Sequence, residues 1–125
     1  MRRLIVTALA ALAVESEAAT YTLNRVSHYN AVRSQTDRNP RMSACGPTRK
    51  GQIALSRDLL RQVGCGAHVR ITVNGKSRVY VVNDTMHRRY RRTADILVNR
   101  VGTARKLGVS RGTLTVLRRG RPYRG

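Results

Sequence analysis

The sequence predicts a small, mainly β domain that closes into a barrel and carries one or two short helices. Val and Ile recur in short apolar runs, and over 69–73 they alternate with polar residues as in a half-buried strand. Asn74-Gly75 then forms a two-residue turn of the kind that joins β-hairpins. A chain of 125 residues is too short for a layered α/β sheet, and closing short strands into a barrel removes exposed edges.

The first residues have the pattern of an export signal. Arg2 and Arg3 precede an apolar run over 4–14, and Ser-Glu-Ala at 16–18 approximates a small-x-small cleavage site. We expect a signal peptide over 1–19, cut after Ala18 or Ala19, and a secreted, periplasmic or cell-envelope protein. A membrane anchor is the alternative, although the apolar run is shorter than the roughly 20 residues that span a bilayer.

The barrel domain is expected over 20–117. The segment 33–45 is polar and turn-rich, with Asn39-Pro40 as a breaker. Apolar runs on either side of it predict the strands, at 20–29, 52–55, 69–73, 79–82, 94–98 and 113–117.

Two short helices are predicted between these strands. Ser56 can cap a helix that runs to Val63 and ends at Gly64, and a second helix is expected over 101–107. Asp58 lies in the first turn of the first helix, where a negative charge meets the positive end of the helix dipole. That structural role accounts for Asp58. Residues 118–125 are expected to form a loose basic tail.

The charge of the chain is extreme. Its 25 basic and six acidic residues give +19, and removal of 1–19 takes two residues of each sign, so the net charge is unchanged. A field of this sign attracts polyanions such as nucleic acid, teichoic-type polymers, anionic lipid or the carboxylates of peptidoglycan stems. Arginine suits bidentate contacts to such groups, although a biased genome or a solvated face accounts for the same excess. The carboxylate side chains left after cleavage are Asp37, Asp58, Asp84 and Asp95.

Cys45 and Cys65 are the only cysteines. In an exported chain such a pair predicts a disulfide, which stabilises by about 3 kcal/mol through loop closure. Two free thiols or half of a metal site are the alternatives. Because no Cys-x-x-Cys motif or matching histidine pair accompanies them, we expect no metal and no cofactor.

Two aspartates border one polar loop. Asp84 ends the apolar run 79–82 after Asn83, and Asp95 begins the next apolar stretch. The loop over 85–93 carries His87, Tyr90 and four arginines, which offer hydrogen-bond donors and a stacking surface for a polar polymer. We therefore nominate Asp84 and Asp95 for catalysis. A solvated basic loop is the plain alternative.

Short motifs follow one another in an order and spacing that resemble a known family. They are YNAV at 29–32, QTD at 35–37, ALS at 54–56, GCG at 64–66, NDT at 83–85, ADI at 94–96 and ARKLG at 104–108. Together they resemble the three-aspartate domains, double-psi β-barrels related to rare lipoprotein A, membrane-bound lytic transglycosylase A and the expansin barrel. The likeness runs from Tyr21 to Leu117.

The resemblance implies a six-stranded double-psi barrel that acts on peptidoglycan. Asp37, Asp84 and Asp95 would be the family aspartates, and Asp95 would be the catalytic one. The implied reaction is lytic transglycosylation of the bond between N-acetylmuramic acid and N-acetylglucosamine. The residues expected to bind substrate are Asp37, Tyr29, Thr85, His87 and Tyr90.

One carboxyl group is enough for this reaction. It protonates the glycosidic oxygen and then takes the proton of the sugar's own C6 hydroxyl, whereas hydrolytic glycosidases usually need two carboxylates. Asp84 would keep Asp95 protonated by like-charge repulsion or stabilise positive charge on the sugar. Met86-His87 stands where the family commonly has Gly-Gly, and the loop arginines would favour ionised aspartates.

Other functions are compatible with parts of the sequence. A non-catalytic module would hold glycan or anionic wall polymer through its arginines. Nucleic-acid binding rests on the charge alone, since no recognisable nucleic-acid-binding motif is present and five tyrosines without Phe or Trp give a thin stacking platform. A metal site from Asp37, Asp84 and His87 is conceivable, yet nothing in the spacing demands it. We expect a monomer directed to peptidoglycan or another anionic wall polymer, without a membrane anchor after processing.

Overall fold

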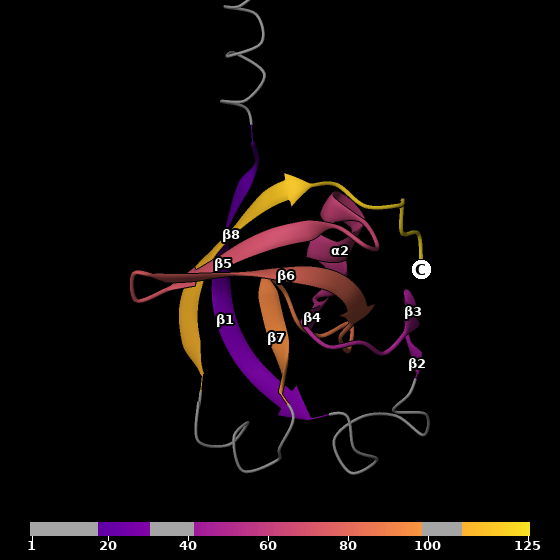
Figure 1. Ribbon diagram of the computed structural model, residues 1–125, viewed down its shortest axis with the longest axis horizontal. Coiled ribbons are helices and arrows are strands. Elements are labelled where there is room, and N and C mark those ends of the chain that lie inside the picture. The colour runs from indigo at the N-terminus through magenta and orange to yellow at the C-terminus, as the bar shows by residue number, and fades with distance from the viewer. Residues whose placement is uncertain (1–17, 31–41, 99–108) are drawn as a thin grey trace, which may run out of the picture.

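Six strands form a closed barrel in the order β1-β7-β4-β6-β5-β8, with β8 returning to β1. The structure is a computed structural model and describes residues 18–30, 42–98 and 109–125. The barrel strands are β1 (Thr20–Asn30), β4 (Gln52–Leu55), β5 (His68–Val73), β6 (Lys76–Thr85), β7 (Thr93–Val98) and β8 (Ser110–Arg118). Figure 1 shows them curving around one axis. The predicted fold class, a mainly β, six-stranded double-psi barrel, is confirmed.

Two strand pairs of the barrel are parallel and four are antiparallel. β1 runs parallel to β7 and β4 parallel to β6, while the antiparallel pairs are β1/β8, β4/β7, β5/β6 and β5/β8. The predicted hairpin is present, because Asn74 and Gly75 both have positive φ, at 53° and 78°, as a type I′ turn requires. β6 is longer than predicted and extends from the hairpin turn to Thr85.

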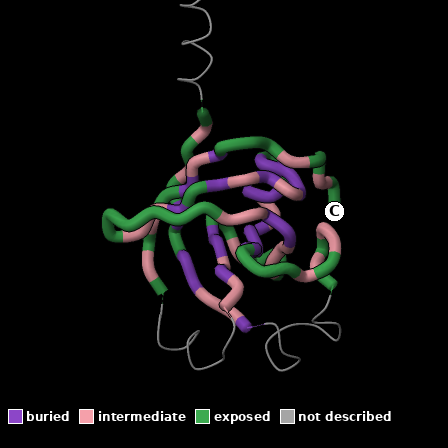
Figure 2. Tube along the Cα trace, viewed as in Figure 1, coloured by how far each residue is buried: buried purple, intermediate pink, exposed green. Residues whose placement is uncertain are grey.

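The barrel interior is filled by aliphatic side chains from every strand. Leu23, Ile53, Val69, Val82 and Leu114 are fully buried, and burial of one such side chain stabilises the fold by about 2 kcal/mol. Figure 2 shows this buried layer inside the barrel, whereas the tip of the β5–β6 hairpin is exposed. A single core therefore serves all six strands.

One helix lies among the described residues, α2 (Arg57–Val63), and it packs Leu59, Leu60 and Val63 into the same core. Its bounds agree with the prediction, and Gly64 follows it with φ 89°. The Ser56 hydroxyl does not cap the helix, because it accepts the backbone N–H of Thr93 at 3.0 Å instead. The helix predicted over 101–107 lies outside the described residues, as does most of the expected signal peptide.

A small hairpin lies outside the barrel sheet. It pairs β2 (Met42–Ser43) with β3 (Gly46–Pro47), at the end of the segment 33–45 that was predicted to be turn-rich. The disulfide between Cys45 and Cys65 ties this hairpin to the residue after Gly64, with Cα atoms 5.5 Å apart. The disulfide predicted from the sequence is thus present.

The C-terminal segment is attached to the barrel. Arg121 exchanges two backbone hydrogen bonds with Cys65, and the Gly120 N–H donates to the Val63 carbonyl. A Cβ at Gly120 would clash with the Cys65 carbonyl, so only glycine allows this approach. These contacts differ from the loose tail expected over 118–125, because backbone pairing, which the sequence pattern does not reveal, holds the segment.

Candidate functional site

Asp84 and Asp95 lie on either side of one small residue, Ala54. Ala54 pairs with Asp95 on β7 and with Asp84 on β6, and Asp95 pairs in turn with Ser27 on β1. Residues paired across neighbouring strands project from the same face of a sheet. We call this set the acidic row; across the sheet it is Ser27, Asp95, Ala54 and Asp84.

The acidic row faces outward from the barrel. Its neighbours along the strands, Ile53 on β4 and Ile96 on β7, point into the core, and successive side chains of a strand point to opposite faces. Two strand spacings separate Asp84 from Asp95, which puts their Cα atoms about 10 Å apart. Both side chains are partly exposed. Two acids distant in the sequence therefore share one outer face.

A β-bulge brings Asp84 into the row. Ile53 pairs with Val82, but the next residue, Ala54, pairs with Asp84, so Asn83 is an extra residue in β6. The Asn83 amide donates to the Pro47 carbonyl at 2.8 Å and to the Gln52 side-chain oxygen at 2.7 Å. The bulge is thus held by hydrogen bonds on both sides.

Asp95 has a weakened acidity. Burial raises its pKa from 3.8 to about 6, and the nearby charge of Asp84 adds to the rise. Two groups oppose it: the Ser27 hydroxyl donates to Oδ1 at 2.8 Å, and Arg25 lies close enough to favour the anion. Asp95 therefore exchanges a proton near neutral pH, as a general acid and base must.

Asp84 is held as a hydrogen-bond acceptor. Its Oδ1 accepts the backbone N–H groups of Ala44 and Thr85, both at 2.9 Å. Two such donors favour an ionised carboxylate, because they stabilise its charge. The two acids of the row thus have different surroundings, one rich in backbone donors and the other largely buried.

Tyr29 lies close to both acids. Burial has the largest effect on its phenol and raises the pKa, and the charges of Asp84 and Asp95 raise it further. The hydroxyl therefore keeps its proton. The Tyr29 hydroxyl accepts the Gln52 side-chain amide at 2.8 Å. Gln52 is fully buried, and its amide also binds the Ser43 hydroxyl, the Arg49 N–H and Asn83. Gln52 therefore connects Tyr29 with the bulge beside Asp84.

The arginine-rich loop is anchored at several points. The Arg57 side chain donates to the Met86 carbonyl, and the Asp58 carboxylate accepts the Arg92 N–H at 3.0 Å. Tyr90 lies between two arginines, with the Arg25 and Arg89 guanidinium carbons 5.9 and 5.0 Å from its ring centre. Since Arg25 also acts on Asp95, the Tyr90 ring lies near one end of the acidic row.

The other nominated residues have local structural contacts. The Thr85 hydroxyl donates to the Leu55 carbonyl at 3.0 Å, and His87 is exposed with its Nδ1 accepting the Arg89 N–H at 3.1 Å. Asp37 lies outside the described residues. No group of three metal-ligating side chains occurs among the residues that the structure describes.

The described cavity lies elsewhere. It has a volume of about 960 Å³ and opens at the end of the barrel beside the β5–β6 hairpin. Asp84 and Asp95 are not among its lining residues. The site predicted from the sequence is therefore an outer face of the sheet, distinct from this cavity.

Comparisons with known proteins bear on the fold. Neither a protein-family model nor a curated protein sequence matches the chain. Among solved structures, the expansin of Clavibacter michiganensis matches 80% of this chain with 19% identity and a TM-score of 0.56. A variant of that expansin in complex with cellohexaose matches with 12% identity and a TM-score of 0.55. This chain spans about half of the expansin, 51% of its length.

A third solved structure is matched over nearly its whole length. The Streptomyces papain inhibitor is matched over 96% of its length and 80% of this chain, with 19% identity and a TM-score of 0.54. At these identities the likeness shows the barrel fold. The expansin barrel is one of the relatives named by the sequence resemblance, whereas the narrower likeness to three-aspartate domains stays a prediction.

The sequence analysis missed three residues of the site. Ser27 and Arg25 act on Asp95, and Gln52 holds Tyr29 and Asn83 together. Ser27 and Arg25 lie on β1, which pairs with β7 over 93–98, a partnership that sequence spacing does not reveal. Gln52 alone offered a hint, since a polar amide at the start of an apolar strand must find partners when buried.

No helix among the described residues has both the length and the apolar content needed to cross a membrane.

Proposed function

We propose that this chain is an exported, polysaccharide-binding barrel that cleaves peptidoglycan as a lytic transglycosylase, with Asp95 as general acid and then base. The observation that carries the proposal is the acidic row. It presents a largely buried carboxyl with a pKa of about 6 beside a second acid, on an outward face of the sheet. The expansin in complex with cellohexaose supports a glycan as the ligand class of this barrel.

Asp95 would carry both proton transfers. Protonated Asp95 gives its proton to the glycosidic oxygen as the bond to C1 breaks. The resulting carboxylate takes the proton of the C6 hydroxyl, and that oxygen bonds to C1 to form a 1,6-anhydro sugar. The proton balance closes on one residue, so neither a second catalytic carboxyl nor an activated water is needed.

Asp84 would act by its charge. Its Oδ1 is held by two backbone N–H groups, so the carboxylate is fixed before substrate binds. A fixed negative charge stabilises the positive charge that develops on the sugar ring. The same charge also raises the pKa of Asp95, which keeps the proton needed for the first step.

The arginine-flanked Tyr90 would bind the sugar chain next to this pair. Aromatic faces stack on sugar rings, and Arg25 and Arg89 would bind carboxylates of the wall polymer. The net charge of +19 would concentrate an anionic polymer near the protein.

The direct test is digestion of purified peptidoglycan sacculi, with 1,6-anhydro muropeptides measured by mass spectrometry. We expect products from the wild type and a loss of at least about 100-fold in Asp95→Asn, as for removal of a general acid. Asp58→Asn is the comparison variant, since it removes one carboxylate outside the row together with the anchor of the loop at Arg92, and it should lose less activity than Asp95→Asn. If wild type and Asp95→Asn release equal, background amounts of 1,6-anhydro muropeptides, the protein is not a lytic transglycosylase.

A non-catalytic wall-binding module is the closest alternative at the same site. It predicts that sacculi retain the protein, that salt releases it steeply, and that Asp95→Asn has no effect on retention. Sedimentation with sacculi at several salt concentrations, run beside the product assay, separates binding from cleavage.

A second candidate is inhibition of a papain-like protease. It is favoured by the extent of the likeness to the Streptomyces papain inhibitor, which covers 96% of that chain against 51% of the expansin. A titration of papain activity with this protein tests it. Tight inhibition by both wild type and Asp95→Asn would favour this candidate over glycan cleavage.

A further inference from the structure

The shortness of β4 leaves the barrel wall open at one end. β4 has four residues and bridges β6 to β7, whereas β6 has ten. The last residue of β4 toward this end, Gln52, pairs with Val81, so β6 from Lys76 to Tyr80 has no β4 partner. The cavity of about 960 Å³ lies in this opening, and we call it the barrel-end cavity.

β6 turns its polar side chains toward the barrel-end cavity. Lys76, Arg78 and Tyr80 alternate in phase with Val82, which is fully buried in the core, and all three line the cavity. Val79 lies in the opposite phase and is 52% exposed. A strand in which Arg78 takes the inner phase while Val79 faces solvent runs against the usual apolar-in, polar-out pattern.

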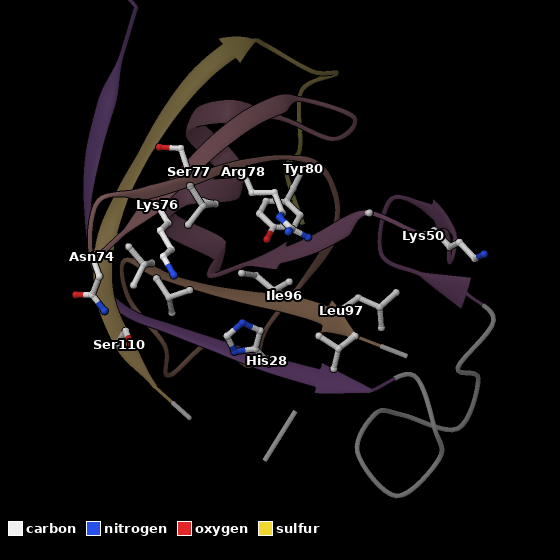
Figure 3. A pocket seen from close by; sticks show the side chains of 15 residues that line it. His28, Lys50, Asn74, Lys76, Ser77, Arg78, Tyr80, Ile96, Leu97 and Ser110 are labelled. Atoms are coloured by element: carbon white, nitrogen blue, oxygen red, sulfur yellow. The ribbon is translucent and has the colours of Figure 1, made fainter. Parts of the chain in front are cut away.

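The facing walls of the cavity are apolar. β5 contributes Ile71 and Val73, β1 contributes Val26, and β7 contributes Ile96 and Val98. In Figure 3, Lys76 extends from β6 toward Ile96, and His28 points into the same space from β1. Burial beside this wall raises the pKa of the Tyr80 phenol, and Arg78 opposes the rise, in keeping with the closeness of the two side chains.

The charges in this cavity have one sign. Lys50, Lys76 and Arg78 are among its lining residues, and none of the described lining residues is acidic. Lys50 lies at the far edge in Figure 3, so Lys76 and Arg78 are the cations nearest the centre. A cationic wall that faces an apolar wall matches a ligand with one anionic end and an apolar body.

We propose that the barrel-end cavity binds a small amphipathic carboxylate of the medium-chain fatty-acid type. The carboxylate would bind Lys76, Arg78 and the Tyr80 hydroxyl, and the chain would lie against Val26, Ile71 and Ile96. The volume lies within the range of small-molecule sites, roughly 300 to 1,000 Å³. This site is separate from the acidic row and does not depend on the function proposed for it.

The first experiment is titration calorimetry at pH 8 with octanoate on the full chain. Octanamide and acetate are the matched probes, since one lacks the charge and the other the apolar body. We expect binding of octanoate and at least about tenfold weaker binding of either control. Hexanoate should bind on the order of tenfold more weakly than octanoate, because two fewer methylene groups are buried.

Variants on β6 locate the site. Arg78→Gln and Lys76→Gln should each weaken octanoate binding about tenfold, as expected for loss of a charge-assisted hydrogen bond. Arg70→Gln is the control, because it removes an exposed charge from neighbouring β5 that does not line the cavity. Val73→Trp should fill part of the cavity and abolish binding in a protein that still melts cooperatively. The exposed β6 variants give the answer if Val73→Trp fails to fold.

Three outcomes overturn the proposal. One is wild-type protein that binds no octanoate up to millimolar concentration. Another is acetate binding as tightly as octanoate, which would mean a simple anion site. The third is a loss in Arg70→Gln equal to that in Arg78→Gln, which would mean attraction by net charge alone.

Discussion

Asp84 and Asp95 are neighbours through a shared partner, since Ala54 pairs with Asp84 on one side and with Asp95 on the other. The small Ala54 side chain leaves no bulky group between the two acids. The two differ in support, because Asp84 accepts two backbone N–H groups whereas Asp95 accepts a serine hydroxyl and is largely buried. The surroundings of Asp95 raise its pKa, and the predictions for Asp95→Asn, Ser27→Ala and Asp84→Asn below depend on this.

Asp95→Asn should change how stability depends on pH. The folded pKa of Asp95, about 6, lies above its unfolded value, so the native state binds more protons between about pH 4 and pH 6. The wild type therefore loses stability as the pH rises through this window. Relative to wild type, Asp95→Asn should gain about 2 kcal/mol between pH 4 and pH 7, measured by urea unfolding.

Asp58→Asn provides the opposite sign. Burial acts to raise the pKa of Asp58, but hydrogen bonds from Ser56 and from backbone N–H groups together lower it. Its stabilising contribution therefore exists above its unfolded pKa and is lost as the pH falls below about 4. Asp58→Asn should therefore be destabilised at neutral pH and approach wild type in acid. Parallel pH profiles for the two variants would contradict both assignments.

Neighbours of Asp95 should shift its titration in opposite directions. Ser27→Ala removes a hydrogen bond to the carboxylate and should raise the pKa of Asp95, whereas Asp84→Asn removes a like charge and should lower it. Carboxyl carbon chemical shifts followed by NMR measure both. If Asp95 titrates unchanged in both variants, the row does not determine its acidity.

Loss of the disulfide should destabilise the protein. Cys45 and Cys65 are separated by 20 residues, and a loop of that size predicts a loss of about 3 kcal/mol in a Cys45→Ala/Cys65→Ala variant. The change should appear as a lower urea midpoint under oxidising conditions. Wild type under reducing conditions should approach the same midpoint, and a midpoint unaffected by either change would refute the prediction.

Gly120→Ala should be destabilising although Gly120 lies beyond the last strand. An added Cβ would clash with the Cys65 carbonyl and disturb the pairing with Arg121, at a cost of about 1 to 3 kcal/mol. Gly75→Ser is a useful contrast, since a side chain there meets no atom and disturbs only the turn conformation. A thermal melt of Gly120→Ala equal to wild type would show that the segment yields without cost.

Local patterns predicted most of the elements. Gln52–Leu55 and the α2 helix appear at the predicted bounds, because an apolar run and a glycine stop depend on neighbours in the sequence. The β2–β3 hairpin was missed, since its two-residue strands depend on a disulfide and on pairing rather than on periodicity. The full length of β6 was also missed. Its inward-facing positions include the charged Lys76 and Arg78, so the strand lacks the usual alternation of apolar and polar residues.

The candidate site was predicted only in part. The acids were identifiable because carboxylates are rare in so basic a chain. Their supporting residues were not, because Ser27 reaches Asp95 through parallel pairing of strands 68 residues apart. The loop arginines were expected to favour ionised aspartates, whereas the arginine that acts on Asp95 is Arg25, which lies on β1.

The extra residue in β6 has one more consequence. In a regular strand, the side chains of Asn83 and Asp84 would point to opposite faces, and one of these polar groups would enter the apolar core of the barrel. Because of the bulge, both side chains lie on the outer face of the sheet, where Asn83 donates a hydrogen bond to Gln52 and Asp84 supplies a charge. Deleting Asn83 would keep Asp84 paired with Ala54 but remove the hydrogen bond from Asn83 to Gln52. This one-residue deletion would therefore test the support of the site while leaving its acid in place.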